Sequence, residues 1–72
     1  DPNPATDAFM LRFANVDPDR IITIYDLSLR KIYESAAFDK SLLIETNSWT
    51  SGTYLIKVQN LSGEQVVKMI KI

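Results

Sequence analysis

The sequence predicts an all-β fold, a small antiparallel β-sandwich of immunoglobulin-like type with about six or seven strands. Short stretches in which apolar and polar residues alternate recur at intervals of roughly ten residues, and turn-forming residues separate them. No stretch shows helical spacing over a convincing length. The chain has 72 residues, 46% of them hydrophobic, and no cysteine, so it can form one modest core held together by packing alone. We therefore expect one domain over residues 1–72.

The first seven residues form a predicted entry arm. They include Pro2 and Pro4, which fix φ and lack an amide donor, so this segment cannot be an interior strand of a sheet. Residues 8–14 then alternate with period two and predict a strand. Its core face holds Phe9, Leu11 and Phe13.

A turn leads to a second predicted strand. Residues 15–19 contain asparagine, aspartate and proline, which favour turns because of their side-chain hydrogen bonds and fixed φ. Residues 20–26 are rich in β-branched and aromatic side chains, with Ile22 and Ile24 on one face. The other face holds Ile21, Thr23 and Tyr25, so we expect both faces to be partly covered.

The middle of the chain continues the same pattern. Residues 27–30 connect to a strand at 31–35, which predicts a hairpin with the preceding strand although no glycine marks the turn. A short buried strand is expected at 42–45. The polar connection 46–52 holds Trp49, which we expect to close one end of the core.

The last third of the chain predicts a second hairpin. Residues 53–59 form the clearest strand, with Tyr54, Ile56 and Val58 inward and Leu55 as the one apolar residue facing outward. Residues 60–64 supply turn chemistry, and 65–72 return as the final strand. That last segment could also present one helical face, but eight residues are too few for a stable isolated helix, so a strand is favoured.

Several kinds of chemistry are not expected. The formal charge of −1 gives no electrostatic reason to bind nucleic acid or an anionic membrane. Without histidine or cysteine there is no convincing catalytic group or metal site, and Asp17-Pro18-Asp19 lacks the spacing of a calcium loop.

The two glycines are isolated, which excludes a phosphate loop, and Asn60-Leu61-Ser62 is interpreted as a turn rather than a glycosylation site. No apolar run approaches the roughly 20 residues of a membrane-spanning helix. We expect no cofactor.

Three landmarks in order along the chain point to a family. They are the proline-asparagine-proline arm at 2–7, the segment 22–27 before the first hairpin, and the segment 51–58, followed by a lysine-bearing last strand at 67–72. Together they resemble the type A C-terminal sorting domain of the type IX secretion system of Bacteroidetes. One departure is Leu29, which stands where that family commonly has a glycine.

The resemblance implies a non-catalytic sorting signal at the end of a larger exported protein, with the cargo N-terminal to Asp1. It implies that the type IX machinery, including an outer-membrane shuttle, reads the domain in the periplasm. A sortase then usually removes it and attaches the cargo to lipopolysaccharide at the outer-membrane surface, or the cargo becomes extracellular. The alternative is an immunoglobulin-like accessory module that binds carbohydrate or protein, or acts as a spacer.

The resemblance also selects candidate recognition residues, each with a structural alternative. The proline-containing arm could simply connect the sandwich to the preceding chain, and the glycine and tyrosine near the start of the strand at 53–59 could have only a structural role. The lysines of the last strand could prevent edge-to-edge aggregation. An exposed edge strand could pair with a second copy or with a receptor. The candidates are Pro2, Asn3, Pro4, Gly52, Tyr54, Lys68, Lys71 and Ile72.

Overall fold

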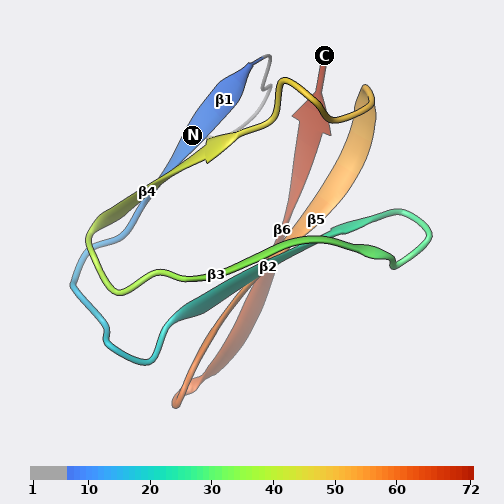
Figure 1. Cartoon of the computed structure of the whole chain (residues 1–72). Coiled ribbons are helices and arrows are strands. Elements are labelled where there is room, and N and C mark those ends of the chain that lie inside the picture. Colours follow the sequence, from blue (N-terminus) through green and yellow to red (C-terminus); the bar gives the residue numbers. More distant parts are fainter. Residues whose placement is uncertain (1–6) are drawn as a thin grey trace.

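The computed structural model describes residues 7–72, which form six strands and no helix (Figure 1). Accordingly, no helix in the described part of the chain could cross a membrane. The prediction of an all-β sandwich is confirmed, while its immunoglobulin-like detail stays a prediction. The strands are β1 Ala8–Arg12, β2 Ile21–Asp26, β3 Lys31–Ala36, β4 Ser41–Glu45, β5 Gly52–Asn60 and β6 Gly63–Lys71.

The strands form two antiparallel sheets. One sheet pairs β1 with β4, and the other has the order β3-β2-β5-β6. The chain therefore passes from one sheet to the other three times, through the β1–β2, β3–β4 and β4–β5 connections. The hairpins β2–β3 and β5–β6 lie within the larger sheet, as the sequence predicted.

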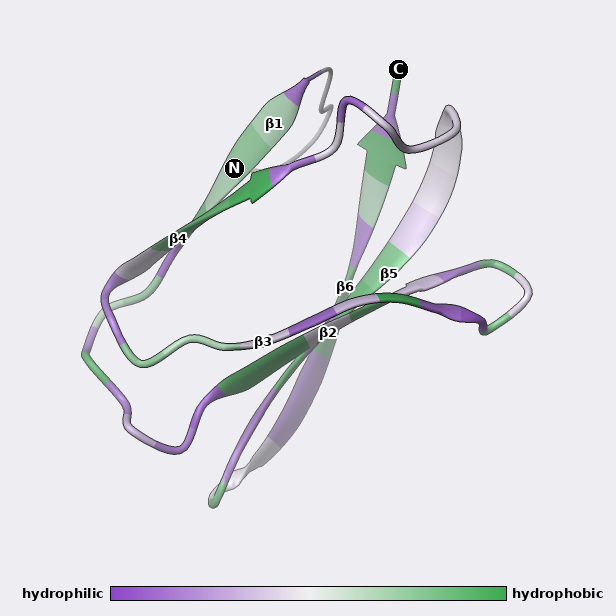
Figure 2. Ribbon diagram, viewed as in Figure 1, coloured by the Kyte–Doolittle hydropathy of each residue, from purple (hydrophilic) through white to green (hydrophobic). Residues whose placement is uncertain are grey.

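The core lies between the two sheets and follows the period-two patterns of the strands. Phe9 of β1 is opposite Ile44 of β4, and Ile24 of β2 is opposite Ile56 of β5; all four are buried. Each such side chain contributes about 1.5–3 kcal/mol when fully removed from water. In Figure 2 hydrophobic segments lie along β1, β2 and β4, and hydrophilic segments lie both in the connections and within strands such as β6. The buried set also includes Ile22, Ala37, Tyr54 and Met69.

The outer face of the larger sheet is also partly covered. Thr23 is only 2% exposed, and Leu55 is half-buried on the same face. Long neighbouring side chains provide this cover, since the Lys57 ammonium lies 5.6 Å from the centre of the Tyr25 ring. Not every aromatic side chain enters the core, because Phe38 is 57% exposed in the β3–β4 connection.

A buried arginine ties two of the crossings between sheets together. The Arg20 guanidinium donates to the carbonyl oxygens of Asn15 at 2.8 Å, Ala37 at 3.2 Å and Asp39 at 2.9 Å. It also lies 3.8 Å from the centre of the Phe13 ring. The β1–β2 and β3–β4 connections are thus held by one side chain that is 7% exposed.

The β5–β6 turn is tied to the β1–β2 connection by side-chain bonds. Asn60 Oδ1 accepts from the Ser62 amide at 2.8 Å, and Asn60 Nδ2 donates to Asp17 Oδ2 at 2.8 Å. Gly63 follows with φ +141°, an angle that favours glycine. The interpretation of Asn60-Leu61-Ser62 as turn chemistry is therefore confirmed.

Candidate recognition surface

The β5–β6 ladder brings three of the sequence-predicted recognition residues to one end of the larger sheet. Gly52 begins β5 and is opposite Lys71, so Ile72 follows directly at the same end. Gly52 has φ +150°, and a Cβ there would meet no atom within 4 Å. The glycine is therefore required for its backbone angle rather than for space.

Tyr54 lies in the core beside this end, so a partner protein cannot contact its side chain at the surface. The Tyr54 side chain is buried, so the predicted inward packing is confirmed, and its hydroxyl donates to the carbonyl oxygen of Thr50 at 2.5 Å. The ring centre lies 5.0 Å from that of Trp49, which lies 6.5 Å from Tyr33. The tryptophan thus closes this end of the core, as expected.

The two lysines of the last strand lie on opposite faces of the sheet. Lys68 is opposite Leu55 on the outer face and is exposed, whereas Lys71 is opposite Gly52 on the inner side and only 8% exposed. Lys71 Nζ donates to the Ile72 carbonyl oxygen at 3.5 Å. A single partner surface therefore cannot contact both ammonium groups in this conformation.

Other parts of β6 are exposed on both faces of the sheet. Val66 and Val67 point to opposite faces and are 55% and 38% exposed, and Ile70 and Ile72 are exposed too. The first part of the strand lies beyond the cover of the smaller sheet, toward the lower end of the β5–β6 hairpin in Figure 1. The remaining candidates, Pro2, Asn3 and Pro4, lie outside the described residues.

The β2–β3 turn stands beside this end and was not among the candidates. Asp26 Oδ1 accepts from the amides of Ser28 at 2.9 Å and Arg30 at 3.0 Å, and Oδ2 accepts from Arg30 Nε at 3.2 Å. Leu29 has φ +64°, so the turn adopts the left-handed angle although a leucine occupies the position. The only sequence signal for this turn is Leu29, which stands where the family commonly has a glycine.

These bonds lower the pKa of the Asp26 carboxyl below its ordinary value of 3.8. The largest cause is the hydrogen bond from the Arg30 backbone amide. Desolvation is the next largest effect and raises the pKa, while the bond from the Ser28 amide and the Arg30 charge lower it further. Asp26 is therefore ionised near neutral pH and holds the turn together.

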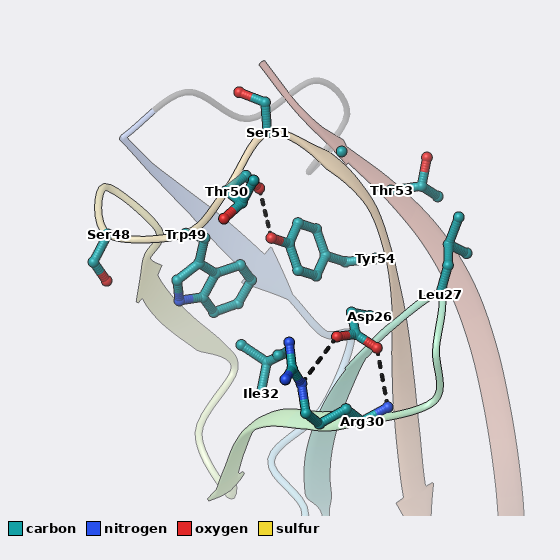
Figure 3. A pocket seen from close by; sticks show the side chains of 11 residues that line it. Asp26, Leu27, Arg30, Ile32, Ser48, Trp49, Thr50, Ser51, Thr53 and Tyr54 are labelled. Carbon is teal, nitrogen blue, oxygen red and sulfur yellow. Dashed lines mark hydrogen bonds and ion pairs between the residues drawn. The ribbon is translucent and has the colours of Figure 1, made fainter.

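A hollow of about 460 Å³ lies between this turn and the β4–β5 connection (Figure 3). Arg30, Asp26 and Trp49 line it, together with Gly52 and Tyr54. Sequence alone could not locate it, because the two connections that form its walls are far apart along the chain. Among residues 7–72 no group of histidine, cysteine, aspartate or glutamate side chains could hold a metal ion.

Comparison with known families decides what kind of domain this is. The model of the secretion system C-terminal sorting domain matches residues 2–72. The chain belongs to this family. Searches of curated proteins and of solved structures found no match. The resemblance to a type IX sorting domain is thereby confirmed over nearly the whole sequence.

Family membership assigns the general role of the chain. A sorting domain of this family is a C-terminal signal for type IX secretion, so the protein that carries it is secreted or displayed at the cell surface. The domain implies contact with the type IX secretion machinery.

Proposed function

We propose that this sorting domain is a non-catalytic signal over residues 1–72 that acts through a folded surface. The machinery, including an outer-membrane shuttle, meets it in the periplasm. A sortase then removes the domain and anchors the cargo at the outer-membrane surface or lets it become extracellular. The family match to residues 2–72 carries this proposal, because it extends over the whole strand framework.

The exposed end of β6 is the part of the fold best suited to recognition. Lys68 and Ile72 are exposed, so we assign contact with the machinery to them. Tyr54 and Lys71 are buried, and we assign to them the role of holding this end of the sheet in place. Gly52 belongs to the positioning group because its angle starts the strand that pairs with Lys71. The arm at Pro2, Asn3 and Pro4 is proposed as a second contact.

The test fuses the chain behind a periplasmic fluorescent protein in a bacterium that has the type IX system. The intact fusion should reach the cell surface, and a version lacking residues 67–72 should stay in the periplasm. Because that deletion removes the fully buried Met69, its melting curve must be recorded alongside. Retention of the intact fusion in the periplasm would refute the proposal.

Lys68→Ala separates recognition from folding more sharply than the deletion. Lys68 is exposed, so its replacement should leave the melting temperature unchanged while lowering surface display several-fold. Lys71→Ala, at a buried position, should instead lower the melting temperature. Equal display of Lys68→Ala and the unchanged fusion would remove Lys68 from the recognised surface.

The accessory-module alternative is less well supported. A carbohydrate site needs exposed rings that can stack on a sugar, and several coplanar rings would favour it. The Trp49 and Tyr54 planes are instead tilted by 46°, and Tyr54 is 6% exposed. The aromatic cluster of this domain is therefore assigned to its core.

A further inference from the structure

The hollow beside the β2–β3 turn is left unused by the proposed function. We propose that it binds an extended acidic peptide segment of the secretion machinery, with a carboxylate held by the two terminal nitrogens of Arg30. This assignment rests on the proposed function and names a further contact for the same machinery, apart from the exposed end of β6 and the arm. It depends on the donors of Arg30, the walls of the hollow and the rigidity of the turn.

Arg30 offers oriented donors that the fold does not use. Its side chain is 78% exposed, its Nε is bonded to Asp26 Oδ2 at 3.2 Å, which restrains the guanidinium group, and neither Nη atom has a hydrogen-bond partner among residues 7–72. In Figure 3 the guanidinium group is directed into the hollow on the side of Trp49. A planar guanidinium with two free donors matches a carboxylate in a bidentate arrangement.

Asp26 does not cancel this preference. Both of its oxygens already accept hydrogen bonds, from the amides of Ser28 and Arg30 and from Arg30 Nε. The hollow therefore presents free donors beside an acceptor that is already occupied. A ligand with acceptor groups suits this arrangement better than a cation does.

The walls of the hollow fit the apolar part of such a segment. Leu27, Ile32 and the half-buried Trp49 line it, with Ile32 on the side of Trp49 and Leu27 across from them in Figure 3. Leu27 is 66% exposed although it stands on a turn held by several hydrogen bonds. A volume of about 460 Å³ can accept a few side chains of an extended segment. An acidic residue next to a large apolar one would contact Arg30 and these walls together.

The binding test titrates the whole chain with an acetylated, amidated glutamate-leucine dipeptide and follows it by NMR. The Arg30 Nε–H, the Trp49 indole N–H and the Gly52 amide should shift and saturate near millimolar concentration, as expected for so small a ligand. The matched glutamine-leucine dipeptide should bind at least tenfold more weakly. Equal shifts with both dipeptides, or none that saturate, would overturn the proposal.

Variants and a sugar probe distinguish the remaining explanations. Arg30→Lys keeps the charge but loses the planar fork and should weaken dipeptide binding several-fold. Lys31→Gln is the matched control, because Lys31 is exposed, pairs with Glu34 at 3.0 Å and does not line the hollow. Its binding should be unchanged. Saturable shifts of the same signals with methyl mannoside but not with the acidic dipeptide would identify a sugar site and sink the peptide assignment.

The export assay then tests the role in secretion. The Arg30→Lys fusion should show several-fold lower surface display at an unchanged melting temperature, while Lys31→Gln should match the intact fusion. If Arg30→Lys is displayed as well as the intact fusion, the docking site is wrong while the sorting role stands. If the intact fusion itself stays in the periplasm, the sorting proposal fails and this inference fails with it.

Discussion

At the scale of single residues, the positive φ angles of Leu29 and Gly52 have consequences that substitution can test. Leu29 has φ +64°, and Gly52 has φ +150°. A side chain at such angles is strained, by about 1–2 kcal/mol in the left-handed region. One position therefore carries a leucine where glycine would relieve strain, and the other carries the glycine it needs.

Leu29→Gly should stabilise the domain. Leu29 is 70% exposed and loses little packing, so removing the strain should outweigh the extra entropy of an unfolded glycine and give up to about 1 kcal/mol. The thermal midpoint should rise by a few degrees. Leu27→Gly, in the same turn but without a positive φ, should lower it; a fall for both variants would show that Leu29 is not strained.

Gly52→Ala should destabilise by about 1 kcal/mol or more, although the added methyl group meets no atom within 4 Å. The cost arises from the angle of +150°, which alanine adopts poorly. Urea unfolding measures it. The exposed neighbour Ser51→Ala should stay within about 0.5 kcal/mol. A neutral Gly52→Ala would mean that the chain relaxes to another angle there.

At the scale of elements, each hairpin has a turn organised by one polar side chain. Asp26 holds the β2–β3 turn through the amides of Ser28 and Arg30, and Asn60 holds the β5–β6 turn through the Ser62 amide. The strands themselves follow from alternation, but the turns depend on these local acceptors. Protonation of Asp26 should therefore weaken its hairpin.

The pH dependence of stability tests this. The pKa of Asp26 is lowered in the folded state, so its stabilising effect is present above the unfolded-state pKa near 3.8 and is lost as the pH falls through the still lower folded-state value. Asp26→Asn should thus be less stable than the unchanged chain at pH 7, and the gap should close below about pH 4.

The measurement is the urea midpoint at pH 7 and at pH 3. Asp39→Asn is the control, because the Asp39 side chain has no hydrogen-bond partner among residues 7–72, and it should leave both midpoints nearly unchanged. A constant gap between Asp26→Asn and the unchanged chain at both pH values would contradict the role assigned to this carboxylate.

At the scale of the whole molecule, the two sheets are joined by core packing and by Arg20. The core draws on both sheets, from Phe9 and Ile44 in one to Ile24 and Ile56 in the other. Arg20 adds three bonds to carbonyl groups of the two connections that pass between them. The sandwich should therefore be sensitive to this one polar residue.

Arg20→Met should cost about 2–4 kcal/mol, because it removes three charge-assisted bonds and leaves one buried and two part-buried carbonyl groups with fewer donors. Arg20→Lys should cost less, since one ammonium can still reach some of these oxygens. The exposed Arg12→Met of β1 should cost no more than about 0.5 kcal/mol. Denaturant unfolding compares the three. If Arg20→Met matches Arg12→Met, the connections are held without the guanidinium.

The amino-acid sequence by itself determined the strands, their inward faces and the family. Alternation placed Phe9, Tyr54 and Ile56 inward, because side chains on a strand point to opposite faces in turn. The order of the landmarks identified the sorting domain, which the match to residues 2–72 confirms. These properties depend on residues close together in the chain, so the sequence pattern alone is enough to predict them.

Only the tertiary structure decided which residues are covered and which meet. Alternation shows which face of a strand a side chain is on, but not whether other parts of the chain cover that face. It therefore could not show that Phe38 is exposed and Lys71 is buried. Likewise, the bonds of Arg20 and the hollow beside Arg30 join segments far apart in the chain. Such contacts depend on how the two sheets pack, and packing is a property of the whole fold.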